Sequence, residues 1–252
     1  NVLMSLGHHG EAAQRLESWS DTSGWSHYAR FNLGVALVRA GDTARGRQFL
    51  EQVGTLQAAN EEQASLRDRA NLALGFALLQ QQGGEDPTAV LNRVRLDGPF
   101  TNKALLALGW AEANASRPDR ALVPWLELQQ RRLLDASVQE SLIAVPYAYV
   151  KLASNGQASE HYRSAVEAYA RESRRIDESI AAIRQGGFLD SILATAPQGD
   201  RPGWFWQLEQ LPDAPHTRYL YHLLASHEFQ EGLKNYRDLR LMQANLAHWT
   251  DS

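Results

Sequence analysis

Apolar residues along the chain follow helical spacing, and one short apolar signature occurs three times. The copies are Asn-Leu-Gly-Val-Ala at 32–36, Ala-Leu-Gly-Phe-Ala at 73–77 and Ala-Leu-Gly-Trp-Ala at 107–111. The second and third copies lie 34 residues apart, and the first lies 41 residues before the second. A period of about 34 residues is typical of stacked two-helix repeats, which are scaffolds for binding rather than reaction centres.

The residues around the first copy predict a helical hairpin. Apolar positions between 28 and 38 recur with helical rather than alternating spacing. Gly41 and Asp42 then interrupt the pattern, with a glycine suited to a helix C-terminus and an aspartate suited to the next N-cap. A second helix is predicted to follow, with Phe49, Leu50 and Val53 on one face.

The glycines of the signature, Gly34, Gly75 and Gly109, stand inside predicted helices. A glycine inside a helix costs roughly 1 kcal/mol relative to alanine. We therefore expect each missing side chain to let the partner helix of the hairpin approach closely.

The third copy resembles the tetratricopeptide repeat (TPR). Leu108 and Gly109 are followed by Ala121, Trp125 and Leu128, at the places where that family has Leu-Gly in its first helix and small or aromatic residues in its second. The first copy has Gly46, Leu50 and Val53 at the corresponding places of the second helix. The resemblance implies an all-α fold, a TPR-like α-solenoid of antiparallel helix pairs, over residues 1–156.

The other copies depart from the family pattern. The second carries an insertion at 80–87, whose Asp86 and Pro87 predict the N-cap and first turn of its second helix. One partial copy lies at the start of the chain, around Leu6-Gly7. Another follows the third copy, with Pro146 in place of the glycine, and contains Tyr149, Leu152, Ala158, Tyr162 and Ala165. We expect that proline to kink or shorten its helix.

Beyond Ala158 the 34-residue period gives way to coiled-coil spacing. Residues 157–184 predict one long helix with steps of four and three between seam positions. The seam positions are Tyr162, Val166, Tyr169, Ser173, Ile176, Ile180 and Ile183. A Pro/Gly/Trp-rich connecting segment follows at about 186–215, and a last long helix is predicted from His216 to Trp249. We expect residues 157–252 to form a long, coiled-coil-like helical hairpin.

Composition and motifs argue against catalysis. The chain has no cysteine, which removes disulfides, thiolate metal sites and a cysteine nucleophile. Its net charge of −4 gives no sign of nucleic-acid binding. No Gly-rich phosphate loop, nucleophile elbow or His-Glu-x-x-His helix occurs, and His8 and His9 are expected to be solvated. We expect no enzyme activity, no cofactor and no metal site.

The TPR resemblance implies where a partner protein or peptide would bind. In that family the first helix of each repeat lines a concave groove that holds peptide segments. By position, the groove would be lined by Phe31, Val35, Arg39, Arg69, Phe76, Gln80, Lys103, Trp110 and Asn114. Asn32, Arg69 and Lys103 stand where some members clamp a C-terminal carboxylate, but the full set is missing. Phe76 and Trp110 suit an apolar or extended peptide, unless both are packed within the superhelix.

A second candidate surface is the aromatic run Trp204, Phe205 and Trp206 in the connecting segment. Three consecutive aromatic side chains cannot all point into one core from a short segment. They serve either as an exposed partner-binding hot spot or as a plug at the end of the helical hairpin.

Together these features predict a non-catalytic, bacterial scaffold or adaptor that binds a partner protein. One alternative is a recruiting or regulatory segment of a larger envelope enzyme or polymer-export assembly, and another is self-assembly through the hairpin. We expect a periplasmic or envelope-associated location, with the cytoplasm as the alternative. The chain begins inside an apparent repeat, so we expect it to be a piece of a longer protein, and it carries no apolar run long enough for membrane insertion.

Overall fold

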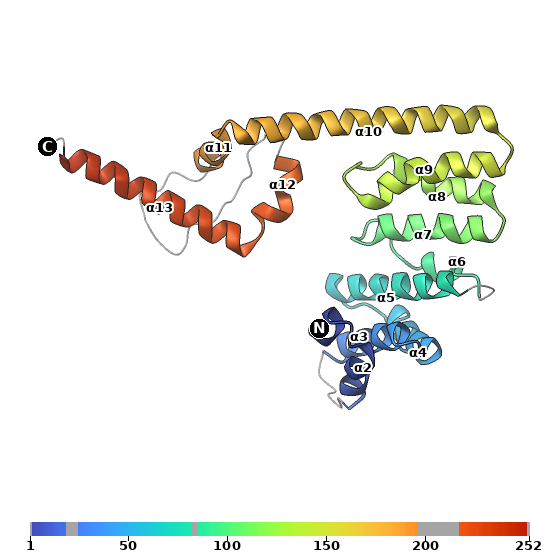
Figure 1. Cartoon of the computed structure of the whole chain (residues 1–252). Coiled ribbons are helices and arrows are strands. Elements are labelled where there is room, and N and C mark those ends of the chain that lie inside the picture. The colour runs from blue at the N-terminus through green and yellow to red at the C-terminus, as the bar shows by residue number, and fades with distance from the viewer. Residues whose placement is uncertain (1, 19–24, 82–84, 196–216, 251–252) are drawn as a thin grey trace. The chain divides into compact units, whose positions relative to one another are not determined.

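The computed structural model describes residues 2–18, 25–81, 85–195 and 217–250, and every regular element in these ranges is an α-helix (Figure 1). The chain divides into two compact units, residues 1–165 and 166–252. The division falls inside the long helix α10 (Asn155–Arg184), nine residues beyond the predicted end of the repeats at 156. The expected all-α architecture is confirmed.

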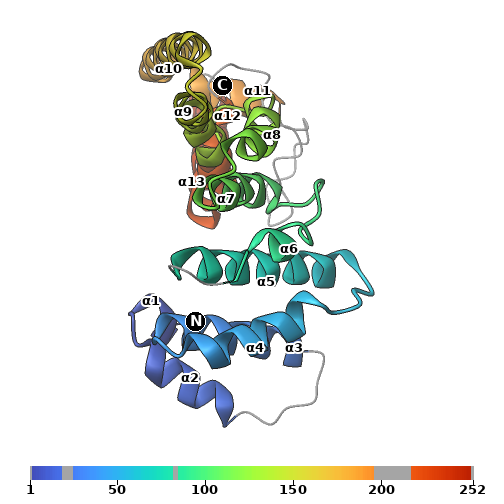
Figure 2. The ribbon, with the colours of Figure 1, turned by 90° about the vertical axis from the view of Figure 1, so that its right-hand side faces the viewer.

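The first unit is a stack of short helices that runs from α2 through α5 to α9 (Figure 2). Neighbouring helices along the chain pack against one another as antiparallel hairpins, with α3 on α4, α7 on α8, and α5 and α9 following each pair. Its helices are α1 (Val2–Ser5), α2 (His9–Glu17), α3 (Ser26–Arg39), α4 (Thr43–Gly54), α5 (Glu61–Gln80), α6 (Thr88–Leu91), α7 (Thr101–Asn114), α8 (Pro118–Gln129) and α9 (Ala136–Lys151).

Local sequence signals set the helix ends of this unit. Gly41 has a φ of +94°, a left-handed conformation that glycine adopts at low cost, and it ends α3. The carboxylate of Asp42 accepts a hydrogen bond from the backbone N–H of Arg45 at 3.3 Å and caps α4. The predicted break at 41–42 is therefore confirmed.

The signature glycines are contact points between the two helices of each hairpin. A Cβ placed on Gly34 would stand 2.8 Å from the Cγ of Leu50, closer than real Cβ contacts allow. The same conflict recurs in each repeat with the residue sixteen positions further on, and the pairs are Gly34 with Leu50, Gly75 with Leu91, and Gly109 with Trp125. The expected close approach is confirmed.

The second repeat differs from its neighbours in the lengths of its helices. Its first helix, α5, has 20 residues, whereas its second helix, α6, has only 4. Asp86 accepts a hydrogen bond from the backbone N–H of Thr88 at 2.9 Å, as expected for a cap. Pro87 stands just before this helix rather than in its first turn, and the helix ends after one turn because the chain turns away after Leu91.

Pro146 neither shortens nor ends α9, which continues to Lys151. Its ring is fully buried, and Val145 and Ala148 beside it belong to the same buried cluster as Trp125. Packing of this apolar face outweighs the backbone hydrogen bond that the proline removes.

The second unit holds the rest of α10, followed by α11 (Gly187–Thr195), α12 (Thr217–Leu224) and α13 (His227–Thr250). The long helix expected from 157 to 184 is confirmed as α10, and Gly186, with a φ of +89°, follows its end. A small core joins the three later helices through Phe188, Ile192, Leu224 and Leu233.

Two details of this unit differ from the sequence prediction. The segment expected to connect two long helices contains a helix of its own, α11. The single helix expected from 216 to 249 is two helices, because the Ser226 hydroxyl accepts a hydrogen bond from the Phe229 N–H at 3.3 Å and starts a new helix there.

The coiled-coil seam is not closed within the described residues. Val166, Ile176 and Ile180 of α10 are 68%, 40% and 41% exposed, and Leu239 and Met242 of α13 are also exposed. The two long helices therefore do not bury these rows against each other, and the second unit is held together by the core around Ile192 instead.

Candidate functional site

Equivalent positions on the first helices of four repeats line up along the stack. Val35, Phe76 and Trp110 each follow a signature glycine on α3, α5 and α7, and Tyr147 follows Pro146 on α9. These helices contact one another in the order α3, α5, α7, α9. We call the four residues the central track.

Trp110 lies between two other aromatic rings. Its ring centroid is 4.9 Å from that of Trp125 in an edge-on arrangement and 5.7 Å from that of Tyr147. Its Nε1 donates a hydrogen bond of 2.8 Å to Glu140 on α9. Trp110 is half-buried, so it contributes to the core with one edge and to the surface with the other.

The remaining predicted groove residues divide into buried and exposed positions. Phe31 is buried in the core of the first repeat, with the Arg69 guanidinium 4.9 Å above its ring centroid. Val35 is half-buried against the same core. Phe76 is 40% exposed, which is unusual for an aromatic residue inside a helix of the stack.

Polar side chains flank the central track on both sides. Exposed polar side chains lie seven residues before the track residue on α5, α7 and α9, and four residues after it on all four helices. A helix places these positions on the same face as the track residue. They are Arg69, Lys103 and Glu140 before the track, and Arg39, Gln80, Asn114 and Lys151 after it. Four of these are cations and one is an anion, although the whole chain has a net charge of −4.

Aromatic residues on this face interact both within one helix and between neighbouring repeats. The Lys151 Nζ lies 5.4 Å from the ring centroid of Tyr147. On α3 the Tyr28 hydroxyl donates a hydrogen bond to Glu62 of α5, and this bond raises the pKa of Tyr28. Tyr147, Lys151 and the exposed Ile143 were not among the predicted groove residues, because the fourth repeat lacks the glycine that marks the others.

Trp204, Phe205 and Trp206 lie outside the described residues, so the aromatic run remains a sequence prediction. Within the described part of the chain, no group of three or more His, Asp or Glu side chains could hold a metal ion. No helix there is long and apolar enough to span a bilayer.

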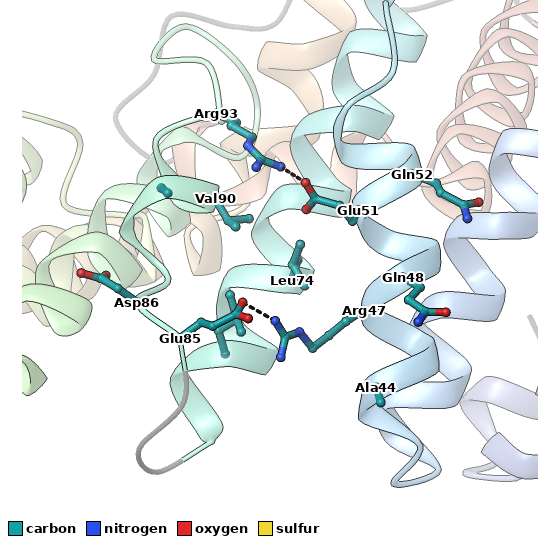
Figure 3. A pocket seen from close by; sticks show the side chains of 12 residues that line it. Ala44, Arg47, Gln48, Glu51, Gln52, Leu74, Glu85, Asp86, Val90 and Arg93 are labelled. Atoms are coloured by element: carbon teal, nitrogen blue, oxygen red, sulfur yellow. Dashed lines mark hydrogen bonds and ion pairs between the residues drawn. The ribbon is translucent and has the colours of Figure 1, made fainter.

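A second feature of the first unit is an open cavity of about 760 Å³ between α4, α5 and α6 (Figure 3). Leu74, Leu78 and Val90 supply its apolar lining. Two ion pairs link α4 to the chain around α6, and both are drawn in Figure 3: Arg47 with Glu85, and Glu51 with Arg93 at 2.6 Å.

A buried polar cluster fixes the loop that follows α6. The Arg95 Nε donates to the carboxylate of Asp68, which is fully buried on α5, at 2.7 Å. The other guanidinium nitrogens donate to Glu61 at 2.8 and 2.9 Å, and these bonds lower the pKa of Glu61. All charged groups here are paired with one another, so the cluster serves to hold the loop in place.

The repeats, the glycine contacts and the stacking order define a TPR-like α-solenoid. Among solved structures the chain is similar to MamA of AMB-1, with a TM-score of 0.51 and 22% sequence identity over 66% of this chain and 92% of that one. It is also similar to MamA of MSR-1, with a TM-score of 0.48 and 22% identity over 68% and 92% of the two chains. No family model and no curated protein sequence matches the chain.

Proposed function

We propose that the chain is a non-catalytic scaffold that holds a segment of a partner protein on the central track. The observation that carries this proposal is the alignment of Val35, Phe76, Trp110 and Tyr147 on four consecutive first helices, with exposed cations beside them. An exposed phenylalanine and a half-buried tryptophan are the kind of side chains that anchor protein interfaces.

The dimensions of the track favour an extended segment. Packed helices lie about 8–10 Å apart, so four helices span roughly 27 Å. An extended chain rises about 3.3 Å per residue, so about eight residues cover that distance. Apolar side chains at every second or third position of the segment would reach successive track residues.

The charges beside the track favour acidic groups on the partner. Arg39, Arg69, Lys103 and Lys151 flank it, whereas the anions on this face are Glu62, which accepts the hydrogen bond of Tyr28, and Glu140. The Glu140 carboxylate already accepts the hydrogen bond of Trp110. An acidic segment is therefore attracted by this face, and its binding should weaken as salt rises.

Binding of defined peptides tests the proposal. The probes are fluorescent nonapeptides with leucine or phenylalanine at alternate positions and glutamate, glutamine or lysine at the others. We expect the glutamate series to bind most tightly, and Phe76→Ala to weaken it about tenfold, as loss of an interface anchor does.

The matched control is Val123→Ala, since Val123 is 72% exposed on the second helix α8. An equal loss of affinity in Val123→Ala, or no binding in any series, contradicts the track as the binding surface. Equal binding of the glutamate and lysine series contradicts only the preference for acidic partners.

Self-assembly is the second candidate function, favoured by the exposed row Val166, Ile176 and Ile180 on α10. Apolar residues in coiled-coil spacing pair when a second copy supplies the same row. Light scattering tests this: Ile176→Lys with Ile180→Lys should turn a concentration-dependent dimer into a monomer, whereas a wild-type chain that stays monomeric at high concentration excludes it.

A further inference from the structure

The array is weakest at α6. This helix is one turn long, whereas the second helices of the neighbouring repeats, α4 and α8, have 12 residues each. Figure 2 shows α6 between the long helices α5 and α7. In the described part of the first unit, this is the only place where a helix of one turn lies between two long helices.

The buried apolar side chains that α7 contributes to its junction with α5 and α6 are all alanines. The buried cluster that joins α5, α6 and α7 contains three alanines, and its members are Leu72, Leu91, Val94, Ala104, Ala107 and Ala111. The cluster that joins α7, α8 and α9 also has three alanines, but it contains eight buried residues rather than six and includes Trp125, Leu105 and Leu128. Because apolar stabilisation follows the area removed from water, the junction at α6 is held more weakly than the next one.

Ion pairs bridge this junction on the side of the cavity. Arg47 of α4 pairs with Glu85 before α6, and Glu51 of α4 pairs with Arg93 after α6 (Figure 3). Each side of the cavity therefore carries one cation and one anion. On the far side of α6, Asp86 pairs with Arg117, next to the start of α8, at 3.0 Å. Every one of these pairs has at least one partner more than a third exposed, where salt screens the attraction.

We infer that α6 is a hinge between two blocks of the array, α2–α5 and α7–α9, and that the pairs Arg47–Glu85 and Glu51–Arg93 hold it closed. High ionic strength releases these exposed pairs and lets the cavity between α4 and α6 widen, while the buried Arg95–Asp68 contact keeps the loop after α6 on α5. Val35 and Phe76 lie on one block, and Trp110 and Tyr147 lie on the other. Opening the hinge therefore changes the spacing between the two halves of the central track.

Spin-label distances measure the hinge directly, because the chain has no cysteine of its own. One labelled pair, Gln14→Cys with Val123→Cys, joins exposed positions on α2 and α8 across the hinge. The control pair, Val123→Cys with Val150→Cys, lies within the α7–α9 block. Distances are recorded at about 0.01 M and about 1 M NaCl, between which the Debye length falls from roughly 30 Å to 3 Å.

We expect high salt to lengthen and broaden the distance across the hinge by several ångströms and to leave the control distance unchanged. An unchanged distance across the hinge overturns the inference. Equal changes in both pairs also overturn it, since they show a general loosening of the array.

Charge exchange then tests which residues hold the hinge. Arg47→Glu with Arg93→Glu should open it at low salt, and adding Glu51→Arg with Glu85→Arg should close it again. The matched control is Arg120→Glu with Arg132→Glu, which changes the net charge equally at exposed positions. Opening by the control variant, or no recovery in the fourfold exchange, contradicts the assignment of these two pairs.

Discussion

The indole ring of Trp125 occupies the space that a side chain at Gly109 would need. Trp125 is fully buried, and its Nε1 donates a hydrogen bond of 3.2 Å to the carbonyl oxygen of Leu106. The glycine on α7 and the tryptophan on α8 therefore form one packing unit. The same geometry, with leucine in place of tryptophan, packs together the two helices of the first repeat and the two helices of the second.

This pairing predicts that Gly109→Ala destabilises the first unit. Overpacking costs typically 1–3 kcal/mol, and the gain in helix propensity returns about 1 kcal/mol of it. Because the conflict is with a rigid, buried ring, we expect the free energy of unfolding to fall by about 2 kcal/mol in urea titrations. The control is Gly156→Ala on α10, where a Cβ meets nothing within 4 Å, and it should be neutral or slightly stabilising.

Trp110 should contribute to the stability of the first unit as well as to binding. Trp110→Ala removes a ring that packs on Trp125 and Tyr147, and we expect a loss of about 3–5 kcal/mol. Trp110→Phe keeps a ring but removes the hydrogen bond to Glu140, and we expect about 1 kcal/mol. Denaturant titrations distinguish them, and equal effects would show that the hydrogen bond, rather than the packing, holds this site.

The ion pair between Asp68 and Arg95 should matter more than the exposed pairs of the array. Arg95→Ala leaves the carboxylate of Asp68 fully buried, with only Arg67 at 3.9 Å as a remaining cation. Removing one member of a buried ion pair is strongly destabilising, because it leaves the other charge buried without compensation. In calorimetry we expect a larger fall in melting temperature than for Arg93→Ala, whose partner Glu51 is exposed. Similar falls in melting temperature for the two variants would show that the buried Asp68–Arg95 pair matters no more than the exposed pair.

Asp86 should make stability depend on pH in the acidic range. Hydrogen bonds from Thr88 and the ion pair with Arg117 favour the charged carboxylate and lower the pKa of Asp86 below its ordinary value of 3.8. A group with a lowered pKa in the folded state stabilises the protein above its unfolded pKa, and this contribution is lost as the pH falls through the folded pKa.

We therefore expect Asp86→Asn to melt below the wild type at pH 7. The difference between the two proteins should shrink towards zero as the pH drops below 3.8. Thermal melts of both proteins across the acidic range provide the check, and a difference that stays constant with pH would show that the charge of Asp86 does not contribute.

Repeat architecture was predictable because it depends on local and periodic signals. The glycine before each track residue, the break at Gly41-Asp42 and the long helix from 157 to 184 all follow from residues close together in the sequence. The predicted groove positions on α3, α5 and α7 likewise follow from a fixed offset to a glycine, and the structure adds Tyr147 at the same offset from Pro146.

The errors have a common cause. The length of α6, the break at Ser226 and the exposed coiled-coil positions depend on which surfaces meet in three dimensions. Spacing in the sequence shows that a helix has an apolar row, but it does not show whether another helix covers that row.

By itself the sequence determined that this protein is a solenoid of helix pairs, because each glycine, cap and apolar period acts within one hairpin. Only the tertiary structure decided how Trp110 is shared between core and surface, and that Tyr147 and Lys151 of α9 extend the central track. It also placed two ion pairs across the cavity beside α6. These properties arise from contacts between repeats, and residues 30 to 42 positions apart come together only when the hairpins stack.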